Sequence, residues 1–257
     1  MNMKNLIKKI LRFQHIYLPL PLFIYKNFFK IKFFHRFFYW YYTLCFDTDY
    51  NYRKAKTTKF NQSYWSSKRA LYWHHVHTHH NRFTEVAYKI FNDFDYLFEN
   101  KKVCDYMCGL SPYFRGRKYD MTFIETNKYC CDILKKDYPN SRVISGNWDI
   151  IEKYQNDIET LFVSSGCLIY LNYQDIEKFF KITNKIKNFI FIHEGTDSED
   201  FSIKYNSHNY WNFENRLKLY NLNYNNSEIF FEKKKYWAKS NVDRKPIFQY
   251  FLYCEKK

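Results

Sequence analysis

The sequence contains no apolar run long enough to cross a membrane. Charged residues and prolines interrupt the most apolar stretch, and no uninterrupted run reaches about 18 residues. We therefore expect no transmembrane helix. A signal-peptide cleavage site is also missing. The 7 cysteines are odd in number and scattered, and two of them, Cys130 and Cys131, are adjacent. This usage predicts reduced thiols in a cytoplasmic protein.

Glycine and proline are scarce, with 5 residues of each type among 257. Aromatic residues make up 23% of the chain, and Lys, Asn, Tyr, Phe and Ile dominate. This bias is typical of an AT-rich genome, so the aromatic excess need carry no functional message. The net charge of +15 favours an anionic partner such as nucleic acid, acidic lipid or a phosphorylated small molecule. A lysine surplus spread over a solvated surface explains the charge equally well.

Two regions of different character divide the chain. Residues 1–60 form a basic, aromatic-rich extension, and residues 61–257 have the pattern of one α/β domain. The extension begins with the amphipathic sequence MNMKNLIKKILRF and ends in a polar linker over residues 47–60. It could pack on the domain, form a partner interface, or lie on an anionic membrane face. The last role would place a cytoplasmic protein peripherally on the inner membrane.

Apolar strands alternate with helices after residue 61, and this order predicts a parallel sheet. One long helix is expected from Ser66 or Ser67 to before Asp95. Strands are expected at KKVCDYM, YDMTFIET, SRVISG, ETLFVSSG and NFIFIHEG, with helices at Lys128–Asp137, Trp148–Tyr154 and Tyr173–Ile186 between them. A helix near Trp211–Leu219 and two antiparallel strands, SEIFFEKKKYWAKS and IFQYFLYCEKK, complete the domain.

The first strand runs into the turn Asp105-Tyr-Met-Cys-Gly-Leu-Ser111, a degenerate form of the pattern D-x-G-x-G-x-G. Such turns are rich in glycine where the backbone approaches a nucleotide closely. Here Met107 and Ser111 replace glycines, and only Gly109 remains. The turn alone is therefore a weak signal of nucleotide binding.

Polar residues at the ends of the later strands strengthen that signal. Glu125 ends the second strand, 16 residues after Gly109, where a carboxylate suits the hydroxyls of a ribose. Asn147 and Trp148 follow the third strand and suit the edge and face of adenine. Small residues after the fourth strand leave space for the rest of a ligand.

From about Tyr64 to Gly195 the chain resembles the class I methyltransferases that depend on S-adenosylmethionine (SAM). It is most similar to small bacterial members from surface-polysaccharide and sugar-modification loci. The resemblance is carried by four segments: VCDYMCGLS, FIETN, VISGNWD and LFVSSGCLIYLNYQDIEKFFKITNKIKNFIFIHEG. It implies a Rossmann-like, mostly parallel sheet of seven strands with helices on both faces and an antiparallel last strand.

The resemblance also implies the roles of individual residues. SAM is the expected cofactor, bound by Asp105, Met107, Gly109, Ser111, Glu125, Asn147, Trp148, Ser164 and Ser165. An oxygen or nitrogen acceptor can need a general base, and the candidates near the edge of the sheet are Tyr170, His193 and Glu194. The implied acceptor is a small polar or anionic molecule in capsule synthesis: a sugar, a nucleotide sugar, or a phosphoryl or phosphoramidate group. O-methylation is favoured over N-methylation.

A cluster of histidines lies between Trp73 and His80. Its spacing is compatible with zinc, but H-E-x-x-H is missing and Glu85 is the only carboxylate nearby, so we expect no metal site. His74, His77 and Arg82 are instead candidates for binding an anionic acceptor. Two further functions remain open: an RNA methyltransferase, although no RNA-binding module is visible, and a non-catalytic Rossmann-like binding protein. A nicotinamide enzyme is disfavoured because G-x-G-x-x-G is missing.

Overall fold

A computed structural model describes most of the α/β domain. The described residues are 65–66, 70–71, 74, 81–164, 167–168, 171–195, 202–205, 208–211, 217–220, 222–232 and 248–256. Residues 1–60 lie outside this set, so their expected role as a basic extension stays a prediction. No helix in the described part of the chain is long and apolar enough to span a membrane.

Four α-helices and nine strands make up the described elements. The helices are α6 (Asn81–Asp93), α7 (Lys128–Asp137), α8 (Ile151–Tyr154) and α9 (Tyr173–Ile182). Short 3-10 turns occur at η1 (Asp95–Leu97), η2 (Trp148–Ile150) and η3 (Gln155–Asp157). The strands are β1 (Lys102–Tyr106), β2 (Asp120–Glu125), β3 (Arg142–Ser145), β4 (Thr160–Val163), β5 (Asn188–Gly195), β6 (Ser202–Tyr205), β7 (His208–Trp211), β8 (Leu222–Glu232) and β9 (Phe248–Lys256).

The first five strands pair in parallel in the order β3-β2-β1-β4-β5. The last strand, β9, pairs antiparallel with β5 along its whole length, and β8 pairs antiparallel with β9. The strand order reverses beside β1, and in an open α/β sheet such a reversal marks where ligands bind, at the carboxyl ends of the strands. The mixed α/β, Rossmann-like fold expected from the sequence is confirmed, including the antiparallel last strand.

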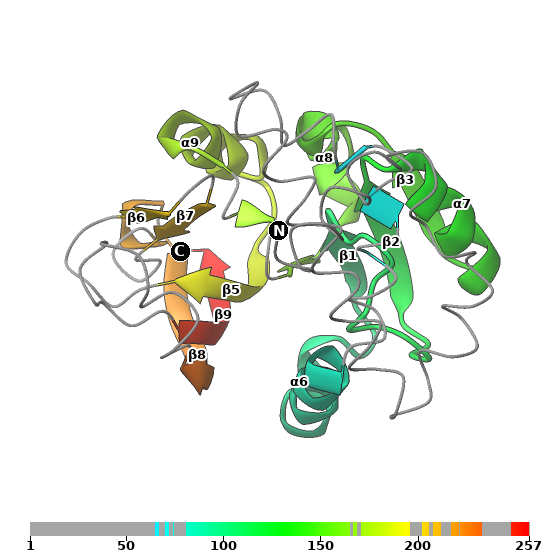
Figure 1. Ribbon diagram of the computed structural model, residues 1–257, viewed down its shortest axis with the longest axis horizontal. Coiled ribbons are helices and arrows are strands. Elements are labelled where there is room, and N and C mark those ends of the chain that lie inside the picture. Colours follow the sequence, from blue (N-terminus) through cyan, green and yellow to red (C-terminus); the bar gives the residue numbers. More distant parts are fainter. Residues whose placement is uncertain are drawn as a thin grey trace, which may run out of the picture.

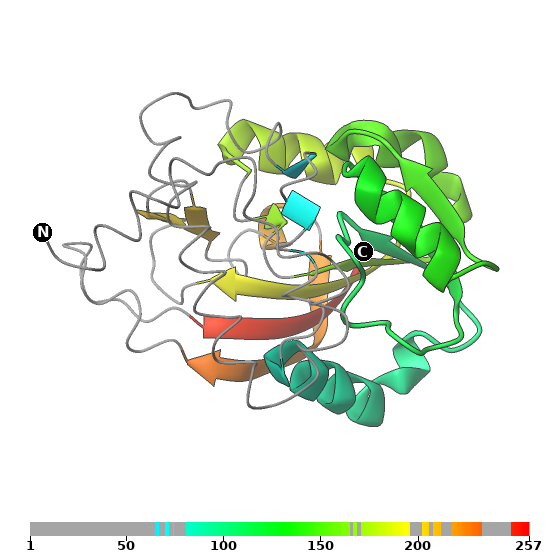
Figure 2. The ribbon, with the colours of Figure 1, turned by 45° about the vertical axis from the view of Figure 1, so that its right-hand side comes forward.

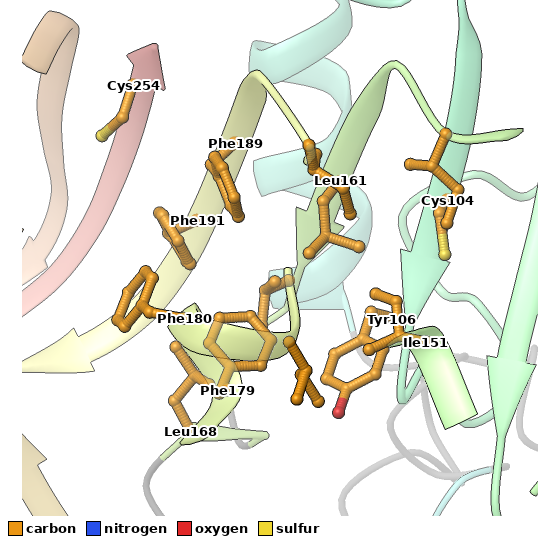
Figure 3. Close-up of a cluster of buried hydrophobic side chains, with 14 of the residues drawn as sticks. Cys104, Tyr106, Ile151, Leu161, Leu168, Phe179, Phe180, Phe189, Phe191 and Cys254 are labelled. Atoms are coloured by element: carbon orange, nitrogen blue, oxygen red, sulfur yellow. The ribbon is translucent and has the colours of Figure 1, made fainter. Parts of the chain in front are cut away.

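Each face of the sheet buries its own apolar cluster. On one face, side chains of α9 pack against those of β1, β4 and β5; the rings of Tyr106 and Phe179 are 5.6 Å apart between centroids (Figure 3). On the other face, α6 packs on β9, where the rings of Phe94 and Phe251 stack at 4.3 Å. Helices α9 and α6 accordingly lie on opposite sides of the sheet (Figures 1 and 2).

Three differences from the expected elements concern the second half of the chain. Nine strands are described instead of seven. The two additional strands form the hairpin of β6 and β7, which the sequence did not predict because it has no clear alternating pattern. Trp211, expected to start a helix, ends β7, and helical geometry is described only at residues 217–219. Helix α9 ends at Ile182, four residues early, because Thr183 leaves helical geometry (φ −100°, ψ 20°) and its hydroxyl donates to the carbonyl of Phe179.

No helix connects β1 to β2; residues 107–119 form an irregular turn. Aromatic side chains cover the sheet in its place. Phe114 is fully buried and makes an edge-on contact with Phe162 of β4 at 4.8 Å between centroids. Phe91 of α6 contacts the same Phe114 ring at 5.4 Å. Part of the aromatic excess, which the sequence left without a function, therefore fills the place of a helix.

Candidate functional site

The turn after β1 keeps the backbone of a glycine-rich loop although it has lost two glycines. Met107, Gly109 and Ser111 all have positive φ angles, of 52°, 58° and 49°. These are the three positions at which the D-x-G-x-G-x-G pattern has glycine. A residue other than glycine costs roughly 1 kcal/mol or more in this region. The packing around the turn therefore enforces a shape that the local sequence disfavours.

One of the two replacement residues has a compensating bond. The hydroxyl of Ser111 donates to Oδ2 of Asp105 at 2.5 Å, and both side chains are buried. The other oxygen of Asp105, Oδ1, is buried and has no hydrogen-bond partner among the described residues. Burial raises the pKa of Asp105 to about 8; the Ser111 hydrogen bond opposes this rise, and the charge of Glu125 adds to it. Asp105 thus holds an unsatisfied acceptor next to the turn.

Glu125, at the end of β2, is tied to this turn. Its Oε2 accepts the backbone N–H of Gly109 at 2.6 Å, and its Oε1 accepts the N–H of Asn127 at 2.8 Å and the hydroxyl of Thr126 at 3.2 Å. The side chain is buried, with 2% of its surface exposed. A carboxylate has about four acceptor positions, so with these three bonds one position remains for a hydroxyl donor. Asn127, which the sequence analysis did not single out, also caps α7 by accepting from the N–H groups of residues 129 and 130.

Three described residues before α6 (Trp65, Leu71 and His74) lie at the same place. A Cβ added to Gly109 would lie 2.4 Å from Nδ1 of His74. Trp65 packs beside His74 at 5.3 Å between ring centroids, and its carbonyl accepts from the Asn127 side chain at 2.7 Å. Leu71 packs with Leu110 and Cys130. Burial lowers the pKa of His74, while the charge of Glu125 opposes that shift. His74 thus lies beside the cofactor candidates.

The residues after β3 join the site through backbone bonds. The N–H of Gly146 donates to the carbonyl of Glu125 at 3.1 Å, and the hydroxyl of Tyr106 donates to the carbonyl of Trp148. Asn147 is exposed and Trp148 is half-buried. The ammonium of Lys178 lies 5.1 Å from the centre of the Trp148 ring, a cation–π distance. Both predicted adenine-binding residues therefore lie at the same edge as Glu125.

The loop after β4 contributes a residue that the sequence analysis did not select. The thiol of Cys167 donates to the carbonyl of Met107 at 3.2 Å and lies 3.9 Å from the hydroxyl of Ser164. Burial raises the pKa of Cys167 well above its usual range, so it remains a neutral donor. Ser164 is buried as part of this contact. The connection links the β4 loop to the strained end of the β1 turn.

The remaining candidates cannot be placed as side chains. His193 and Glu194 belong to β5, beyond the point where β4 ends, and Arg82 belongs to α6. The structure describes only their backbone. Ser165, Tyr170 and His77 lie outside the described residues. No group of His, Cys, Asp and Glu residues suited to a metal ion occurs in the part of the chain that the structure describes.

The chemistry of the described donors fits an adenosyl cofactor. Asp105 offers a buried acceptor without a partner, which suits a ligand ammonium. Glu125 offers a carboxylate with an acceptor position left for a ribose hydroxyl. Trp148 offers a half-buried aromatic face. These three groups follow three adjacent strands, β1, β2 and β3, at one edge of the sheet.

Comparison with known proteins finds similarity in solved structures only; no protein-family model and no curated protein matches the sequence. The chain is similar to a SAM-dependent methyltransferase from Leishmania major, with 12% identity, a TM-score of 0.47, and coverage of 70% of this chain and 73% of that chain. A SAM-dependent methyltransferase from Anabaena variabilis has 12% identity and a TM-score of 0.47, with coverage of 65% of this chain and 82% of that chain. A Burkholderia thailandensis N-methyltransferase solved with S-adenosylhomocysteine has 8% identity and a TM-score of 0.44, with coverage of 68% of this chain and 78% of that chain. No residue role rests on likenesses this distant.

Proposed function

We propose that this protein is a SAM-dependent methyltransferase of the class I type. The observation that carries the proposal is the left-handed backbone at Met107, Gly109 and Ser111, joined by the Gly109 N–H to Glu125. A chain that has lost two of three glycines keeps the loop shape at an energetic cost. Strain of this kind persists where the surrounding structure over-determines it, and it is concentrated at functional sites.

Each end of the cofactor has a matching group in this proposal. Asp105 would accept from the ammonium of the methionine part, Glu125 from a ribose hydroxyl, and Trp148 would cover the adenine. The Ser111 hydroxyl holds Asp105 in place through the 2.5 Å bond. SAM supplies an activated methyl group when it is bound. The protein's own task is to align the acceptor with that group and to exclude water, which lowers the barrier by several kcal/mol, roughly.

The acceptor in this proposal is a small polar or anionic molecule, methylated on oxygen. A sugar, a nucleotide sugar, or a phosphoryl or phosphoramidate group of a capsule or surface glycan fits the resemblance carried by the four segments named above. Tyr170, His193 and Glu194 are the candidate bases that would accept the proton of its hydroxyl. His77 and Arg82 are candidates for contact with its negative charge.

Calorimetry with S-adenosylhomocysteine (SAH), SAM and NAD tests the proposal. We expect the full chain to bind SAH and SAM with a micromolar Kd and to show no heat of binding with NAD. Glu125→Gln should weaken SAH binding, whereas Gln155→Glu, a change at a buried side chain on η3, should leave it unchanged. Undetectable binding of SAH and SAM at millimolar concentration would refute the proposed function. If the protein binds SAH but transfers no methyl group from SAM to any molecule in a cell extract, it is a non-catalytic binding protein.

A further inference from the structure

The positive φ angle of Gly109 does not explain why this position is a glycine. Met107 and Ser111 have nearly the same φ as Gly109, yet both carry side chains. The chain therefore tolerates non-glycine residues at this backbone geometry. What distinguishes Gly109 is contact: a Cβ there would lie 2.4 Å from His74 Nδ1 and 3.0 Å from His74 Cε1. Glycine is required at the point where another group approaches the backbone, and in this structure that group is an imidazole.

The imidazole lies where the proposed function puts the cofactor. A glycine at the centre of such a turn permits close approach of a ligand. His74 is also near enough to Glu125 for the carboxylate charge to affect its pKa. Glu125 is 2% exposed under this cover, although the proposed function needs its oxygens to reach a ribose hydroxyl. The His74 side chain therefore occupies the small volume beside Gly109 that the proposed function assigns to the cofactor.

Three contacts of different kinds hold this cover, which we call the cap (Trp65, Leu71 and His74). Trp65 accepts a hydrogen bond from Asn127, Leu71 packs on Leu110, and His74 contacts Gly109. Neither a single hydrogen bond nor one buried leucine is a large contribution on the scale of a folded domain. Contacts of this size are strong enough to keep a short segment in place and weak enough for a ligand to displace it.

We propose that the cap occupies the cofactor's place on the turn after β1 and must move away before the cofactor binds. The inference rests on the proposed function, because it concerns regulation of the same site. It also reassigns His74, which the sequence placed with the acceptor, to control of cofactor entry. A ligand that competes with a closed state binds with an affinity reduced by the fraction of molecules that are open. Loosening the cap therefore strengthens binding.

Calorimetry with SAH tests this inference through the sign of the effect. His74→Ala empties the contested volume, and the Kd for SAH should fall roughly 3- to 30-fold. His74→Gln refills most of that volume, and its Kd should stay within about twofold of wild type. Leu71→Ala leaves the imidazole but loosens the segment, so its Kd should also fall. Ile186→Ala, at a buried side chain before β5, controls for general destabilisation and should leave the Kd unchanged.

Two outcomes separate failure of the inference from failure of the proposed function. If wild type binds SAH and His74→Ala binds it equally or more weakly, the cap does not oppose cofactor binding. His74 then either contacts the ligand or has no effect on its binding. If neither protein binds SAH, the proposed function is wrong, and the cap as a control of cofactor entry is wrong with it.

A readout without any ligand tests the contact itself. Gly109→Ala should lower the Tm by about 5 °C or more, because the new methyl group collides with the imidazole. The loss should be smaller when His74→Ala is also present. Gly116→Ala is the matched control, because Gly116 also has positive φ (78°) but no atom within 4 Å of an added Cβ. Its effect on the Tm should be the same in both backgrounds; equal losses for Gly109→Ala in both would overturn the contact.

Discussion

The backbone N–H of Gly109 donates to Oε2 of Glu125 at 2.6 Å, and this bond joins the turn after β1 to the end of β2. The two residues are 16 positions apart in the sequence: Gly109 lies in the turn after β1, and Glu125 ends β2, the parallel neighbour of β1. The same carboxylate accepts the N–H of Asn127 at the start of α7. Glu125 therefore organises the site even before any ligand is considered.

Replacing Glu125 should reduce stability as well as SAH binding. Glu125→Gln keeps the volume but presents an NH2 group to one of the two backbone donors, leaving one N–H buried without an acceptor. Such a loss costs about 1–3 kcal/mol. Urea denaturation should show a lower midpoint with an unchanged m-value. Gln155→Glu, on η3 and outside this turn, provides the comparison for calorimetry only, because it introduces a buried charge of its own.

Glycine restored at the two altered positions of the turn should have opposite effects. Met107→Gly relieves a left-handed residue and should stabilise the protein by up to about 1 kcal/mol. Ser111→Gly relieves the same strain but removes the bond to Asp105, so a buried carboxyl loses its partner and stability falls by about 1–3 kcal/mol. Thermal denaturation of the two variants measures the difference. Stabilisation of Ser111→Gly would show that the bond to Asp105 contributes little.

The sequence predicted the strands because their signals are local. The predicted segments KKVCDYM and YDMTFIET exceed β1 and β2 by one residue at each end, and NFIFIHEG matches β5 along its whole length. Contacts between distant segments left no local signal. Neither the approach of His74 to Gly109 nor the thiol of Cys167 on the Met107 carbonyl follows from any periodicity. In place of a helix between β1 and β2, Phe114 of the turn and Phe91 of α6 pack over the sheet, and these contacts between distant segments leave no periodic signal.

Asp105 should make stability depend on pH. Its pKa is raised from 3.8 to about 8 in the folded protein, so the folded state keeps a proton that the unfolded chain loses between these values. The contribution of Asp105 is therefore fully present below about pH 4 and is lost as the pH rises through 8. Asp105→Asn should remove this slope and gain stability at pH 8 relative to wild type, by on the order of 1–3 kcal/mol. Urea midpoints at pH 5, 6.5 and 8 measure the slope.

The same titration predicts proton release on cofactor binding. A ligand ammonium next to Asp105 favours the ionised carboxylate, so SAH binding at pH 7 should release up to about one proton. Calorimetry in two buffers of different ionisation enthalpy measures the number released. Asp105→Asn should bind SAH more weakly and release fewer protons. Equal proton release by the variant would move the ammonium site away from Asp105.

Acidification should open the cap through His74. Burial holds the pKa of His74 below its ordinary value in the closed state, against the opposing attraction of Glu125. The closed state therefore favours the neutral imidazole, which predominates at neutral pH. This preference for the closed state is lost as the pH falls below about 6.5, the ordinary pKa of histidine. SAH should therefore associate faster with the wild type at pH 5.5 than at pH 7.5.

A ratio of two proteins isolates this effect from that of Asp105, which is mostly protonated at pH 7.5 because its pKa is about 8 and whose protonation is complete at pH 5.5. His74→Gln has the same Asp105 but cannot titrate at position 74. The association rate of wild type divided by that of His74→Gln, measured by stopped-flow fluorescence, should rise between pH 7.5 and pH 5.5. A constant ratio would mean that the imidazole does not change its charge when the cap opens. The cap would then depend on the packing of Leu71 and the Trp65 hydrogen bond alone, and neither of these contacts responds to pH in this range.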